Sequence, residues 1–87
     1  MVRMARPATD PDLSTYRGRF AANLRTLRQK RFDTQAEFVE ALEVQGLVVV
    51  LMTVSSWERG ARVPPVDSMP QIAKALGVPI RHLLPTE

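Results

Sequence analysis

The sequence predicts an all-α fold of five short helices. Apolar residues recur at intervals of three and four along most of the chain, which is the period of a helix with one buried face. Glycine and proline stand between these segments, where they end helices and form turns. With 87 residues, 45% of them hydrophobic, the chain can form one compact domain with a small core. We expect that domain over residues 16–87, after a flexible arm over residues 1–15.

The first helix is expected over residues 16–31. Phe20, Leu24 and Leu27 are spaced by four and three residues, so they share one face. The charges of this segment are all positive, whereas those of residues 32–50 are all negative. The basic side chains are Arg17, Arg19, Arg25, Arg28, Lys30 and Arg31, and the acidic ones are Asp33, Glu37, Glu40 and Glu43. The basic helix either faces an anionic partner or is a solvated surface.

The second helix is predicted to begin at Thr34. Thr34 and Glu37 have the spacing of a capping box, in which the hydroxyl accepts a bond from a first-turn amide and the carboxylate reaches back. Gly46 is a suitable end for this helix.

The segment that follows, residues 47–54, is ambiguous because its valines favour a strand. The rest of the chain offers no second strand, so we interpret residues 47–49 as an extended connection packed on the core. A third helix then starts near Val50 or Leu51 and ends at Gly60.

Two further helices are predicted after the stiff linker that contains Pro64 and Pro65. The fourth begins at Asp67 or Ser68 and ends at Gly77. The fifth is a short helix over residues 80–84.

Three sequence blocks in this order resemble the phage-repressor/Cro-like (Xre-type) helix-turn-helix family. They are TQxxFV at residues 34–39, TVSxWERGxxxP at residues 53–64 and IAKALGVP at residues 72–79. The likeness covers residues 16–84. It implies a lambda-repressor-like DNA-binding domain whose third helix, about residues 51–59, lies in the major groove of double-stranded DNA.

The resemblance also suggests which residues contact DNA. The start of the second helix would meet a phosphate, the third helix would face bases, and nearby basic side chains would meet other phosphates. The candidate DNA-binding residues are Lys30, Arg31, Thr34, Gln35, Leu51, Met52, Ser55, Ser56, Arg59 and Arg62. Arg28 and Glu58 occupy the positions of a structural ion pair in this family, so we expect them to join the first and third helices. Trp57 is expected in the core.

Two features depart from the family pattern. The connection between the second and third helices is longer than the commonest spacing by about five residues. Leu51 and Met52 fall on positions that usually face base edges, although they cannot form the hydrogen bonds that identify a base. Three roles are open for Leu51 and Met52: they pack against the long connection, they contact another protein, or they touch thymine methyl groups in DNA. Base readout is therefore expected to be weak, or assisted by Ser55, Ser56 and DNA shape.

We therefore predict a DNA-binding transcriptional regulator that acts as a homodimer. Its dimer surface would come either from the last helix, around Ile80, Leu83 and Leu84, or from residues 47–52. The alternative is a protein-interaction module on the same scaffold that uses the apolar surface of residues 47–52, with DNA binding weak or lost.

Other function classes are not expected. The chain has no cysteine and one histidine, His82, which excludes a disulfide and a Cys- or His-based metal site. No serine has a base and an orienting partner nearby in sequence, so we expect neither an enzyme nor a cofactor. The longest apolar run, residues 47–52, is far shorter than a membrane helix, and the start of the chain does not resemble a secretory signal. We expect a cytoplasmic protein.

Overall fold

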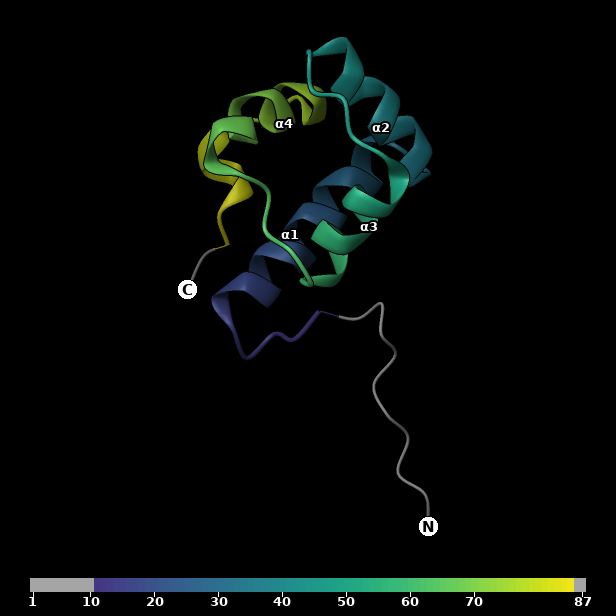
Figure 1. Cartoon of the computed structure of the whole chain (residues 1–87). Helices are drawn as coiled ribbons and strands as arrows, with labels where there is room; N and C mark the ends of the chain where they lie inside the picture. Colours follow the sequence, from purple (N-terminus) through teal and green to yellow (C-terminus); the bar gives the residue numbers. More distant parts are fainter. Residues whose placement is uncertain (1–10, 86–87) are drawn as a thin grey trace.

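The computed structural model describes residues 11–85, and this part of the chain contains helices and no strand (Figure 1). The all-α class is confirmed. The described elements are α1 (Tyr16–Arg31), α2 (Gln35–Val44), α3 (Leu51–Arg59), η1 (Val66–Ser68), α4 (Met69–Leu76) and η2 (Ile80–Leu83), of which η1 and η2 are 3-10 helices.

The predicted count of five helices is wrong, because the described residues form four α-helices. The last predicted helix is the 3-10 helix η2, which lies between Pro79 and Pro85. The few residues between the two prolines are too short a segment for a stable α-helix, so they form the tighter turn. The fourth helix also differs in its start, because the Ser68 hydroxyl donates to the Pro65 carbonyl (2.6 Å) in η1 and does not cap α4.

The core lies where α3 packs on α1 and α2, and where α4 packs on α2 and α1. Trp57 is buried, as predicted. Burial of each large apolar side chain contributes about 1.5–3 kcal/mol, which is what holds helices too short to be stable alone. The fully buried members of this core include Leu24, Phe38, Leu42, Val54, Ile72 and Leu83.

Local hydrogen bonds define the helix ends close to the predicted positions. The capping box at the start of α2 is present, with Thr34 Oγ1 accepting from the Glu37 amide at 3.2 Å. α2 ends with Gly46 in the left-handed region (φ 87°), and the Leu47 amide returns to the Leu42 carbonyl at 2.9 Å. α3 ends in the same way at Gly60.

Residues 1–10 of the predicted arm lie outside the described residues, and residues 11–15 form a turn against α1. The Asp12 carboxylate accepts bonds from the Ser14 amide (3.0 Å) and hydroxyl (2.7 Å), and Thr15 caps α1 by accepting from the Gly18 amide (2.9 Å). A Cβ at Gly18 would overlap the Asp12 carbonyl, so this close approach requires glycine.

Candidate nucleic-acid interface

α3 has one side inside the protein and one side toward solvent. Val54, Trp57 and Glu58 are buried, whereas Ser55 and Ser56 are partly exposed. Arg59, Leu51 and Met52 lie on the same outer side, where Leu51 and Met52 are the most exposed. The outer side of α3 is therefore not covered by other described parts of the chain.

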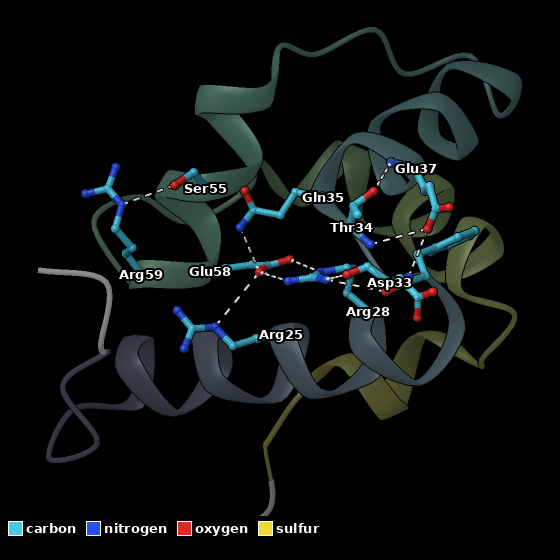
Figure 2. A network of polar contacts seen from close by, with 10 residues as sticks. Arg25, Arg28, Asp33, Thr34, Gln35, Glu37, Ser55, Glu58 and Arg59 are labelled. Atoms are coloured by element: carbon cyan, nitrogen blue, oxygen red, sulfur yellow. Dashed lines mark hydrogen bonds and ion pairs between the residues drawn. The ribbon is translucent and has the colours of Figure 1, made fainter. Parts of the chain in front are cut away.

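Arg59 lies along this outer side over two hydroxyl groups. Its Nε donates to Ser55 Oγ at 3.4 Å, and its Nη2 donates to Ser56 Oγ at 3.2 Å. Figure 2 shows Arg59 beside Ser55, on the side of α3 away from Arg28. The C-terminal half of α3 thus presents a guanidinium and two hydroxyls as one cluster of hydrogen-bonding groups.

Arg62 extends this cluster beyond the end of α3. It lines a shallow hollow together with Met52, Thr53 and Ser56 of α3 and with Val50. Its side chain is exposed. Two of the predicted phosphate-binding arginines, Arg59 and Arg62, therefore share the outer side of α3.

A buried polar network holds the opposite side of α3 in place (Figure 2). Arg28 and Glu58, which the resemblance paired, form a two-point ion pair: Nε donates to Oε2 at 3.0 Å and Nη2 donates to Oε1 at 2.9 Å. Gln35 Nε2 also donates to Glu58 Oε1, at 3.0 Å, and Arg25 Nε lies 3.9 Å from the same oxygen. Glu58 thereby links α3 to both α1 and α2.

Arg28 also reaches the connection between α1 and α2. Its Nη1 donates to the carbonyls of Phe32 (3.4 Å) and Asp33 (3.1 Å). The hydrogen bonds to Glu58 raise the pKa of Arg28 above its ordinary value, although burial alone would lower it. Arg28 is therefore a permanently charged structural residue and not a DNA contact.

The start of α2 is less favourable for a phosphate than the sequence suggested. Glu37 Oε1 accepts from the amides of Asp33 (2.9 Å) and Thr34 (3.3 Å), so a carboxylate occupies part of the helix start. The remaining first-turn amides are those of Gln35 and Ala36, which have no acceptor within the helix. Because the Gln35 side chain is bound to Glu58, its contact with a phosphate would be through the backbone.

The basic residues at the end of α1 do not all lie near α3. The Arg31 guanidinium lies over the Phe32 ring (5.7 Å to its centroid) and beside Gly77, at the end of α4. Lys30 is exposed. Arg31 is exposed as well and lines a hollow with Asp33 and Glu37 at the start of α2, so both basic residues keep their predicted availability.

One predicted dimer residue is wrong, because Leu83 belongs to the core and is fully buried. The reason is the docking of η2 on α1: Asn23 Nδ2 donates to the carbonyls of His82 (2.8 Å) and Leu83 (3.0 Å). Ile80 and Leu84 remain exposed.

Sequence reasoning missed two members of the Glu58 network. Arg25 lies three residues before Arg28, so the two share a face of α1. This spacing could have predicted that Arg25 also lies near Glu58. Nothing local in the sequence indicated that the Gln35 side chain reaches α3, since the two residues are 23 positions apart.

Two further kinds of feature were searched for in residues 11–85. No group of three or more His, Cys, Asp or Glu side chains in this range is placed to hold a metal ion. No described helix has the length and apolar character needed to cross a membrane.

The chain matches no known protein family, no curated protein and no solved structure at a significant level. The geometry of α3 and its surroundings is therefore the basis for assigning a function.

Proposed function

We propose that this protein is a transcriptional regulator that binds double-stranded DNA with α3 in the major groove. The observation that carries the proposal is the division of α3 into a buried side, anchored by Glu58, and an outer side that presents Ser55, Ser56 and Arg59. The major groove is about 12 Å wide and admits one α-helix. A helix held only from its inner side can enter such a groove without rearrangement.

Phosphate contacts supply most of the affinity in this proposal. Arg59 and Arg62 lie together at the end of α3, and Lys30 adds an exposed charge at the end of α1. Backbone amides at the start of α2 provide a further contact. Neutralising phosphates releases counterions from the DNA, so binding weakens steeply as the salt concentration rises.

Base readout is the weaker part of the proposed interaction. Ser55 and Ser56 can exchange hydrogen bonds with base edges, whereas Leu51 and Met52 can meet only thymine methyl groups. Sequence preference then depends partly on the shape of the DNA. A homodimer bound to two half-sites about one helical turn apart would double the number of contacts. The proposed regulator acts in the cytoplasm and uses no cofactor.

A titration against duplex DNA of mixed sequence, at two salt concentrations, tests this proposal. We expect binding at low salt and a steep loss at high salt. Arg62→Ala should weaken binding to every sequence and reduce the slope of log K against log salt by about 1 if Arg62 neutralises one phosphate.

Arg81→Ala is the matched control, because it removes the same charge from an exposed residue of η2. It should leave the salt slope unchanged. The proposal fails if the protein does not bind at low salt, or if Arg81→Ala weakens binding as much as Arg62→Ala.

A protein-interaction module is the second candidate function, and one observation favours it. The start of α3 and the connection before it expose Val48, Val50, Leu51 and Met52 to solvent. Exposed apolar patches often mark protein interfaces. Absence of DNA binding at low salt would favour this alternative.

A further inference from the structure

We infer that a shallow hollow at the start of α3 binds the C5 methyl group of a pyrimidine base, so that the chain distinguishes methylated from unmethylated pyrimidines in double-stranded DNA. The hollow has a volume of about 140 Å³ and is lined by Val50, Met52, Thr53, Ser56 and Arg62. Thymine and 5-methylcytosine both carry this methyl group and present it in the major groove. The inference rests on the proposed function, because it requires α3 to enter that groove.

The apolar wall of the hollow consists of Val50 and Met52, which the fold does not use. Val50 is the N-cap residue of α3 and forms no side-chain hydrogen bond to the helix, although a polar residue at this position usually stabilises a helix. Val50 is 65% exposed and Met52 is 74% exposed, so neither side chain belongs to the core. These two apolar side chains therefore serve neither capping nor packing, and they can contact an apolar group of a partner.

The volume of the hollow limits the group that it can bind. Sites for whole cofactors and drug-sized ligands usually measure about 300–1,000 Å³, whereas one water molecule takes up about 30 Å³. A hollow of about 140 Å³ has room for a group of a few atoms, such as a methyl group and the base edge that carries it. It is too small for a complete cofactor.

The charged side of the hollow suits the backbone of the same nucleotide. Among the lining residues Arg62 alone is charged, and it is exposed. The C5 position of a pyrimidine lies at the edge of the base nearest its own strand, so a methyl group against Val50 and Met52 brings a phosphate of that strand toward Arg62. Because a positive charge adjoins the apolar wall, an anionic partner that carries a methyl group fits the hollow better than an uncharged protein surface does.

The two hydroxyl groups of the hollow can bind either methylated base. A hydroxyl both donates and accepts hydrogen bonds, so Thr53 or Ser56 can donate to O4 of thymine or accept from the N4 amino group of 5-methylcytosine. The hydroxyls therefore do not separate the two bases. The methyl group, which both bases share, is the feature that the hollow recognises.

Binding to three duplexes of the same mixed sequence tests the inference. The first contains thymidine and cytidine, the second has deoxyuridine in place of thymidine, and the third has deoxyuridine together with 5-methylcytidine. Fluorescence anisotropy at low salt should show that the wild-type chain binds the second duplex about four-fold more weakly than the first, which is the usual effect of losing one buried methyl group. Tighter binding of the third duplex than of the second identifies 5-methylcytosine as a ligand, and equal binding assigns the hollow to thymine.

Val50→Ala tests the apolar wall directly. It truncates half of this wall and should reduce the preference for the first duplex over the second from about four-fold to about two-fold. Val66→Ala is the matched control, because it makes the same chemical change at a residue of η1 that is 80% exposed, and it should leave the preference unchanged.

Equal affinity of the wild-type chain for the first two duplexes overturns the inference. A Val66→Ala variant that loses the preference as Val50→Ala does also overturns it. In both cases the chain still binds DNA, so the proposed function stands. A chain that binds none of the three duplexes at low salt overturns both the inference and the proposed function.

Discussion

The two ends of α3 reverse the usual distribution of polar and apolar residues. Glu58, near the C-terminal end, is charged and fully buried, whereas Met52, near the N-terminal end, is apolar and 74% exposed. The carboxylate is satisfied by Arg28 and Gln35, so its burial leaves no unpaired charge. Met52 has no comparable partner within the described chain. The comparison shows that one end of α3 serves the fold and that the other remains available to a partner.

The burial of Glu58 and the exposure of Met52 are both tolerated, because the carboxylate has hydrogen-bond partners and the methionine side chain needs none. A buried carboxylate without hydrogen bonds would cost several kcal/mol, and the two-point contact with Arg28 offsets that cost. An exposed methionine costs the folded state little, since the unfolded chain also exposes it to water. Substitutions along α3 should therefore have very different effects on stability.

The largest effect is expected from Glu58→Ala. Removing this carboxylate leaves Arg28 charged and buried without its partner, which should lower the free energy of unfolding by about 3–5 kcal/mol. Urea denaturation measures the loss. The paired replacement Arg28→Met with Glu58→Leu is the control, because it removes both charges and should cost less. A loss below about 1 kcal/mol, the range of exposed ion pairs, would contradict the structural role.

The contribution of Arg28 to stability should not vary with pH near neutrality. Its pKa is raised by the hydrogen bonds to Glu58. A raised pKa on a basic group gives stabilisation that is fully present below the unfolded-state pKa and lost only as the pH rises past the folded-state value. For arginine both values lie far above neutral pH. The stability difference between wild type and Arg28→Ala should therefore be the same at neutral and at mildly alkaline pH, as measured by urea denaturation.

A smaller effect is expected from Val54→Ala, in the middle of α3. Val54 is fully buried, so truncation removes two methyl groups from the core and should cost about 2 kcal/mol. Val50→Ala makes the same chemical change at an exposed position and should alter stability by less than about 0.5 kcal/mol. Thermal unfolding of a dilute sample compares the two. Equal losses would show that the connection before α3 is packed more tightly than its exposure indicates.

An effect smaller than that of Val54→Ala is expected from Gly60→Ala, at the end of α3. A Cβ there would lie 3.6 Å from its nearest neighbours, which is ordinary contact, so the cost arises from the backbone angle of φ 81°. We expect a loss of about 1 kcal/mol, with a similar loss for Gly46→Ala at the end of α2, where φ is 87°. Chemical denaturation should show both. A much larger loss at Gly60 would indicate steric crowding against Ala21 and Pro11.

Local sequence signals predicted the α-helices well. The capping box of Thr34 and Glu37 and the glycines at 46, 60 and 77 mark helix ends because they act through bonds and angles within a few residues. The extended connection also followed from the sequence, since the valines had no second strand to pair with. The Arg28–Glu58 pair was expected from the family resemblance alone.

Long-range packing explains what the sequence did not predict. Leu83 has the local pattern of a surface helix, and only the docking of η2 on α1 through Asn23 shows that it is buried. Arg31 lines a hollow beside α2, as its place in the sequence suggests, but its contact with Gly77 at the end of α4 could not be predicted locally. For both residues the decisive neighbour is more than forty positions away in the chain.

By itself the sequence determined the helical class, most helix boundaries and the absence of charge between Glu43 and Glu58, because these depend on nearby residues or on composition. Only the tertiary structure decided which side of α3 is covered, which arginines stand together on its outer side, and that Val48 and Val50 face solvent. The physical reason is that a helix forms through bonds within one turn, whereas the exposure of its faces depends on elements that fold against it from distant parts of the chain.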